Sequence, residues 1–238
     1  MSAGLPVRTG GTGPHAGRRL ATAGPSLAHA RLAMVMLHGR GAGADDMLGL
    51  ADHLALPDVA VLAPNAAGNS WWPDSFLAPL AANGTGLDSG LSVVTDLLDH
   101  LGQAGFGPER TVLVGFSQGA CLALEAAARL ARPFRAVAGL SGGLVGTAEA
   151  GGPPREDLYG RPDKAFDYDG SLVGPNGSGV PVLLGCHSQD PHIPLARVTR
   201  TAEVLEAMGA TVETMVIPGA GHGIVNEEAA WLRGRLNG

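Results

Sequence analysis

The feature that most constrains the fold is the stretch Gly115-Phe116-Ser117-Gln118-Gly119, together with what flanks it. An apolar, β-branched run at 111–114 precedes it, and a run of helix formers at 120–130 follows it. This order predicts a strand, a sharp turn and a helix, with the serine hydroxyl exposed at the turn. A Cβ at either glycine would clash, because strand and helix must pass closely there. The alternative, an ordinary surface serine in a glycine-flanked turn, is disfavoured by that strand and helix.

Apolar runs and amphipathic segments alternate along the rest of the chain. Continuous apolar runs are typical of parallel strands that are covered on both faces. The expected strands lie at 32–37, 59–63, 111–114, 135–140, 182–186 and 211–217, and the expected helices at about 45–54, 91–101, 120–130, 197–208 and 227–236. This alternation predicts the α/β class, with a mostly parallel sheet of about six to seven strands and helices on both faces.

Three segments carry no clear periodicity. Residues 1–31 are expected to form an N-terminal arm, with a short antiparallel edge hairpin around Val7 and residues 18–22. Residues 65–88 are expected to be irregular, and residues 144–179 are too rich in glycine and proline for regular structure. We therefore expect one domain over 32–238, with a loop insert at about 144–179.

Composition excludes several classes of protein. Hydrophobic residues make up 45% of the 238 residues and charged residues 16%, which indicates a folded globular chain. The net charge of -6 and a pI near 5.7 argue against a nucleic-acid partner and against an anionic membrane surface. No apolar run approaches the roughly 18 residues of a membrane span, and the N-terminus lacks the apolar core of a signal peptide. Cys121 and Cys186 lie in apolar runs and are expected to be buried, reduced thiols of a cytoplasmic protein.

The loops that follow the expected strands hold the groups needed for acyl transfer. Such loops emerge at one edge of a parallel sheet, where ligand sites gather. A serine hydroxyl needs a base to take its proton, and His222 is the candidate base for Ser117. Asp190 is the candidate acid that orients the imidazole and stabilises it once it is charged. The chain order serine, aspartate, histidine is that of α/β-hydrolases.

Other residues could take the roles assigned to this triad, but their positions are less suitable. The rival acids Asp163, Asp167 and Asp169 lie in the insert, away from any strand end, and so does Lys164, the only lysine available for a Ser–Lys dyad. The alternative for His222 is an ordinary histidine in a loop. The alternative for Asp190 is an acid that caps a helix. A metal site built from His187, Asp190, His192 and His222 is disfavoured because the triad already uses two of them.

Four motifs in order resemble the phospholipase/carboxylesterase family of α/β-hydrolases, which includes the acyl-protein thioesterases. They are His38-Gly39-Arg40-Gly41, Gly115-Phe116-Ser117-Gln118-Gly119-Ala120, Asp190-Pro191-His192-Ile193-Pro194 and Gly221-His222. The resemblance runs from about Leu32 to the C-terminus. It implies an esterase that acts on carboxylic esters or thioesters without a metal or an organic cofactor. It also implies an oxyanion hole formed by the backbone N–H groups of Arg40 and Gln118.

The expected substrate pocket is partly aromatic. Trp71, Trp72 and Phe76 follow a strand end and are expected to form an apolar wall, although they would also fit a plain core. Leu144, His192 and Ile193 complete the expected pocket, His192 as a wall or hydrogen-bonding residue. The Arg40 side chain either pairs with Asp45 or Asp46 or meets an anionic substrate.

The sequence thus predicts a serine hydrolase that cleaves esters or thioesters of small to medium acyl groups through an acyl-enzyme on Ser117. One alternative is a lysophospholipase or acyl-protein thioesterase that acts on long acyl chains. Another is a catalytically silent binding protein on the same scaffold, since a fold alone does not establish activity. A peptidase or C–C bond hydrolase would use the same triad. The sequence leaves a monomer and a homodimer open.

Overall fold

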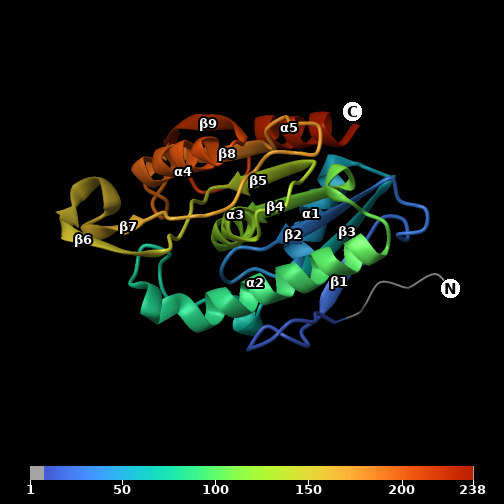
Figure 1. Ribbon diagram of the computed structural model, residues 1–238, viewed down its shortest axis with the longest axis horizontal. Coiled ribbons are helices and arrows are strands. Elements are labelled where there is room, and N and C mark those ends of the chain that lie inside the picture. Colours follow the sequence, from blue (N-terminus) through green and yellow to red (C-terminus); the bar gives the residue numbers. More distant parts are fainter. Residues whose placement is uncertain (1–7, 238) are drawn as a thin grey trace.

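The computed structural model describes residues 8–237, and its main feature is a seven-stranded sheet of order β1-β3-β2-β4-β5-β8-β9 (Figure 1). The strands of this sheet are β1 (Leu20–Ala23), β2 (Leu32–Leu37), β3 (Val59–Pro64), β4 (Thr111–Phe116), β5 (Ala136–Leu140), β8 (Pro181–Gln189) and β9 (Thr211–Ala220). The helices are α1 (Ala44–Leu54), α2 (Leu80–Gln103), α3 (Gln118–Leu130), α4 (Leu195–Ala207) and α5 (Asn226–Asn237). Three short 3₁₀ turns are η1 (Ala67–Asn69), η2 (Pro108–Arg110) and η3 (Glu156–Leu158).

The sheet is parallel except at one edge, where β1 pairs antiparallel with β3. Every residue of β2, β3 and β5 is buried, as is expected for parallel strands covered on both faces. The predicted fold class, a mostly parallel α/β sheet with helices on both faces, is confirmed.

Two helical layers cover the sheet. Residues of α1 and α5 share one core cluster with alternate side chains of β2, such as Met34 and Met36. Residues of α2, α3 and α4 share the other cluster with the intervening side chains, such as Val35 and Leu37. The period of two along the strand therefore assigns each β2 side chain to one of the two cores.

The prediction of an irregular segment at 65–88 is wrong over its last part, because α2 begins at Leu80 and runs for 24 residues. The sequence pattern indicated only its second half. Two of its glycines lie against other chain segments: a Cβ on Gly86 would come within 2.3 Å of the Trp71 carbonyl oxygen, and one on Gly90 within 3.0 Å of Leu122. These glycines allow close packing instead of ending the helix.

The insert at 144–179 is also more regular than expected. It contains β6 (Ala148–Arg155) and β7 (Arg161–Ala165), which form a separate two-stranded antiparallel sheet. This hairpin projects from the main body on the side of α4 (Figure 1). All residues of β6 are exposed. The strand therefore lacks the alternation of apolar and polar residues from which a strand is predicted.

The expected N-terminal hairpin is present only as a single bridge. Arg8 and Arg19 form an isolated antiparallel bridge, and β1 pairs with β3. Val7 lies outside the described residues.

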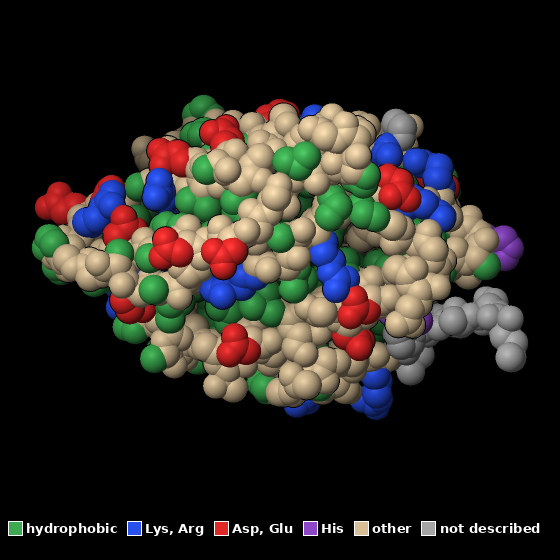
Figure 2. Space-filling view, viewed as in Figure 1, with side chains coloured by type: hydrophobic (Ala, Val, Ile, Leu, Met, Phe, Trp, Pro, Cys, Tyr) green, Lys and Arg blue, Asp and Glu red, His purple; other side chains and the backbone are tan. Residues whose placement is uncertain are grey.

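The surface and the helices bear on the expected partners. Figure 2 shows acidic and basic side chains interspersed over the face in view, with no broad patch of one sign. Within residues 8–237 no helix combines the length and hydropathy needed to cross a membrane.

Candidate active site

The turn between β4 and α3 holds Ser117 in a strained backbone conformation, with φ 54° and ψ −118°. The flanking glycines are required by contact. A Cβ on Gly115 would lie 2.1 Å from the Gly119 carbonyl oxygen, and a Cβ on Gly119 would lie 2.1 Å from the carbonyl oxygen of Leu37. The predicted strand–turn–helix with close glycine contacts is confirmed. A positive φ at a serine costs on the order of 1–3 kcal/mol. The surrounding structure therefore holds Ser117 in place against this strain.

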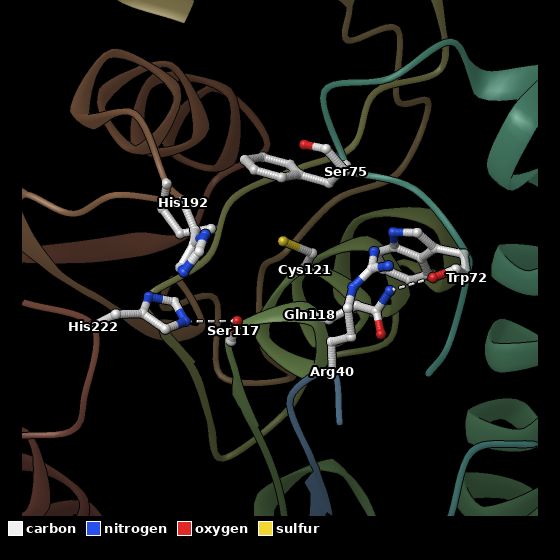
Figure 3. Close-up of a pocket in the computed structure, with 10 residues that line it drawn as sticks. Arg40, Trp72, Ser75, Ser117, Gln118, Cys121, His192 and His222 are labelled. Carbon is white, nitrogen blue, oxygen red and sulfur yellow. Dashed lines mark hydrogen bonds between the residues drawn. The ribbon is translucent and has the colours of Figure 1, made fainter. Parts of the chain in front are cut away.

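Ser117, His222 and Asp190 are brought together from three strand ends. His222 Nε2 lies 2.8 Å from Ser117 Oγ, and His222 Nδ1 lies 2.8 Å from Asp190 Oδ2 (Figure 3 shows the first contact). The Asp190 side chain is fully buried, and its second oxygen accepts the backbone N–H groups of His192 at 2.8 Å and Ile193 at 3.0 Å. This carboxylate is therefore fixed on both sides, with one oxygen left for the imidazole.

The rival groups have other partners. Asp163 forms ion pairs with Arg155 and Arg197, and Lys164 Nζ lies 2.6 Å from Glu149. The ring of His187 packs against Gly221, where a Cβ would come within 2.6 Å of it. Within residues 8–237, no three side chains among His, Cys, Asp and Glu are grouped as a metal ion would need.

The resemblance assigns the oxyanion hole to the backbone N–H groups of Arg40 and Gln118, and the structure shows the surroundings of both. Gln118 is the first residue of α3, and the first N–H groups of a helix have no acceptor within it. The loop that holds Arg40 packs against the serine, since a Cβ on Gly39 would lie 3.2 Å from Ser117 Cβ. No acceptor among the described residues is bonded to the Arg40 N–H. Neither N–H is thus bonded to an acceptor among the described residues.

The Gln118 side chain has a further role that the sequence analysis missed. Its Oε1 accepts the backbone N–H of Trp71 at 2.8 Å, and its Nε2 donates to the Trp72 carbonyl at 2.7 Å. The aromatic loop is thereby tied to the start of α3. The signal in the sequence is a glutamine directly after the serine of the turn, and the structure buries its side chain to 6% exposure.

Two buried histidines also form hydrogen bonds to the loop that holds Trp71 and Trp72. His38 accepts the Ala66 N–H at Nε2 and contacts the Gly39 carbonyl through Nδ1. His15 accepts the Ala67 N–H at Nδ1, and its Nε2 lies 2.8 Å from the Trp71 carbonyl. Burial lowers the pKa of both rings, which matches the neutral form that these hydrogen bonds require.

A cavity of about 390 Å³ opens beside Ser117. Four of the six expected pocket residues line it. They are Trp72, Phe76, His192 and Ile193. The His192 ring also makes an edge contact with His222, with 4.9 Å between the centroids.

The other two expected pocket residues, Trp71 and Leu144, belong to the core. Trp71 is fully buried, and its Nε1 donates to the His38 carbonyl at 2.9 Å. Leu144 is also fully buried, and its backbone N–H donates to Thr201. The indole bond to His38 and the backbone bond to Gln118 hold Trp71 in the core, and of the two tryptophans only Trp72 lines the cavity.

The cavity is also lined by two residues that the sequence analysis did not predict for the pocket, Ser75 and Cys121. Cys121 is buried as expected, and burial raises the pKa of its thiol to about 12. It stands four positions after Ser117, which places it one helical turn along the same face. That spacing is the signal that could have indicated it.

The Arg40 side chain forms neither expected ion pair. Asp45 pairs with Arg19, and Asp46 accepts the N–H of Gly43. The guanidinium instead donates to the carbonyl oxygens of Pro73 and Asp74, and it lines the cavity.

Comparison with known proteins shows the family of this chain. Residues 22–152, just over half of the chain, match the phospholipase/carboxylesterase family. The chain belongs to this family. The match includes Arg40 and Ser117 and ends before Asp190 and His222.

The similarity to solved structures covers more of the chain than the family match does. A phospholipase/carboxylesterase from Dyadobacter fermentans is 33% identical, with a TM-score of 0.80, over 96% of this chain and all of that chain. The esterase PE8 is 28% identical, with a TM-score of 0.67, over 91% of this chain and 96% of that one. Acyl-protein thioesterase 1 of Gibberella zeae is 31% identical over 139 residues, which are 56% of this chain. The chain spans about half, 51%, of the length of that relative.

Proposed function

We propose that this chain is a serine hydrolase that cleaves carboxylic esters or thioesters of small to medium acyl groups through an acyl-enzyme on Ser117. The observation that carries the proposal is the pair of 2.8 Å contacts from His222 to Ser117 Oγ and to Asp190 Oδ2. A nucleophile, a base and a group that orients the base are the parts of a catalytic triad.

The proposed reaction runs in two halves. His222 Nε2 takes the proton of Ser117 as Oγ attacks the carbonyl carbon, while Asp190 holds the Nδ1–H and stabilises the imidazolium. The N–H groups of Arg40 and Gln118 bind the oxyanion of the tetrahedral intermediate. The intermediate expels the alcohol or thiol, which receives its proton from His222. Water, activated by the same imidazole, then releases the acid and restores the serine.

The size of the cavity supports small to medium acyl groups. About 390 Å³ is near the lower end of the range for small-molecule sites, about 300–1,000 Å³. Trp72 and Phe76 border it and are themselves buried, so they limit its extension. Long acyl chains would need a further apolar channel.

A substrate screen tests this proposal. We expect a fluorophosphonate probe to label the protein and nitrophenyl esters and thioesters of two to about six acyl carbons to be hydrolysed fastest. A specificity constant that rises steadily to long chains would favour the lysophospholipase or acyl-protein thioesterase alternative, since each buried methylene contributes about 0.8 kcal/mol. The absence of both labelling and turnover would favour the silent binding protein.

We also infer a cytoplasmic setting, supported by Cys121 and Cys186, which are both free and buried. Recovery of the protein from an oxidising compartment of its native cells would contradict this inference.

A further inference from the structure

The cavity beside Ser117 is lined unevenly in charge. Ten described residues line it, and Arg40 is the only one that carries a permanent charge; none is aspartate or glutamate. This is notable in a chain with a net charge of -6. A lone positive group at the wall of a concave site attracts anions into it.

No carboxylate neutralises this charge among the described residues. The Arg40 guanidinium donates only to two backbone carbonyls, of Pro73 and Asp74. A guanidinium has five N–H donors, so these two bonds fix its position and leave donors free. A neutral carbonyl holds an arginine in place without cancelling its charge.

A second donor at the same wall lacks a partner. The indole Nε1 of Trp72 is buried and has no acceptor among the described residues. Buried donors of this kind are uncommon in folded proteins. Figure 3 shows Trp72 and Arg40 together at one end of the cavity, with His192 and His222 at the other.

We propose that the substrate carries a carboxylate, bound by the Arg40 guanidinium and the Trp72 indole N–H, while its ester carbonyl lies at Ser117. This inference rests on the proposed function and specifies its substrate class. A charge-assisted hydrogen bond of this kind is stronger than a neutral one and is oriented by the planar guanidinium. The carboxylate belongs to either the acyl half or the alcohol half of the ester, and two matched pairs of substrates separate these cases.

The first pair is mono-4-nitrophenyl glutarate and its neutral methyl ester, which differ in charge on the acyl side. The second pair is the acetate ester of 4-hydroxyphenylacetic acid and that of its methyl ester, which differ in charge on the alcohol side. For one of the two pairs, we expect the wild-type kcat/KM to be about ten- to hundredfold higher for the carboxylate, after subtraction of the rate without enzyme. Equal values within both pairs, or a preference for both neutral esters, would overturn the proposal.

Variants then identify the groups responsible. The readout is the ratio of kcat/KM for the charged and the neutral ester, because Arg40 also fixes the backbone at 73–74 and each rate alone can change. The ratio should fall to near one in Arg40→Gln and partly in Trp72→Phe, which keeps an aromatic ring and removes the N–H. Arg19→Gln, which removes an exposed arginine paired with Asp45, should leave the ratio unchanged.

If the ratio is unchanged in Arg40→Gln, the proposal is wrong. If the ratio is unchanged in Trp72→Phe, the role assigned to the indole N–H is wrong. If Arg40→Gln does not fold, the salt dependence of the wild type decides: the preference should shrink between low and high ionic strength, and a constant ratio would contradict it. Turnover of neutral esters without a charge preference would sink this inference alone. Absence of any ester turnover would sink the proposed function.

Discussion

The side-chain oxygen of Gln118 accepts the backbone N–H of Trp71 at 2.8 Å, which couples the helix that starts at the serine to the loop that forms the cavity wall. The Gln118 amide nitrogen completes the link at the Trp72 carbonyl. One side chain thus sets where the aromatic wall stands relative to Ser117, independently of the backbone N–H that the same residue offers to an oxyanion.

The first prediction separates these two roles of Gln118. Gln118→Ala keeps the backbone N–H and removes two buried hydrogen bonds, so we expect a loss of stability of about 1–3 kcal/mol. We also expect KM to rise more than kcat falls, because the wall moves while the oxyanion donor remains. Urea unfolding and steady-state kinetics check this. A fall of kcat alone, at unchanged KM and stability, would contradict the role in positioning.

A second prediction concerns the cysteines. Burial raises the pKa of Cys121 to about 12, against an ordinary value of 9.0. The thiolate fraction at pH 8 is therefore about a thousandfold smaller than for an exposed cysteine, although Cys121 borders the cavity. We expect almost no reaction with iodoacetamide in the native protein and rapid reaction of both cysteines in urea, as measured by peptide mass spectrometry. Fast native alkylation of Cys121 would refute this.

A third prediction concerns pH and stability. Glu228 is buried with one oxygen unpartnered among the described residues, and burial raises its pKa to about 7. The folded state therefore binds the proton more tightly than the unfolded state, where the ordinary value is 4.5. This contribution to stability is fully present below pH 4.5 and is lost as the pH rises through 7.

Between pH 5 and pH 8, the unfolding free energy of the wild type should therefore fall by about 2–3 kcal/mol more than that of Glu228→Gln. Urea titrations at the two pH values measure it. Glu206→Gln, at an exposed glutamate of α4 that does not influence Glu228, is the matched control and should behave as the wild type does. The same pH dependence in Glu228→Gln and in the wild type would rule out Glu228 as the cause.

A fourth prediction concerns the start of the insert. The Glu125 carboxylate is fully buried in α3, pairs with Arg129, and accepts the N–H groups of Val145 and Gly146 and the hydroxyl of Tyr168. Removing it leaves several buried donors without an acceptor. Glu125→Ala should therefore lower the unfolding free energy by about 3–5 kcal/mol. Glu203→Ala, which removes an exposed ion pair, should cost less than about 1 kcal/mol. Similar losses in the two variants would disprove the anchoring role.

The sequence was sufficient for the parts that follow from strand ends. The β-branched run before Ser117, the two glycines and the order of Ser117, Asp190 and His222 indicated both the sheet and the grouping of these three side chains. Each of these depends on local pattern and on the geometry of parallel strands, which brings the carboxyl ends of strands to one edge.

What the sequence did not indicate depends on packing between distant segments. Gly86 in α2 resembles a helix breaker until it is seen against Trp71. The β6–β7 hairpin has no apolar face, and its cross-strand pair Glu149 and Lys164 is joined by an ion pair instead. In the same way, the orientation of Trp71 into the core and of Trp72 toward the cavity depends on Gln118, His38 and other partners far away in the chain.

The most direct test of the central claim is the hydrolysis of a short nitrophenyl ester by the wild type and by Ser117→Ala. If Ser117 forms the acyl-enzyme with His222 and Asp190 as one unit, kcat should fall on the order of a millionfold. The double variant Ser117→Ala/His222→Ala should then be no slower than the single one, because residues that act as a unit are not additive. Turnover by Ser117→Ala within about tenfold of the wild type would contradict the account.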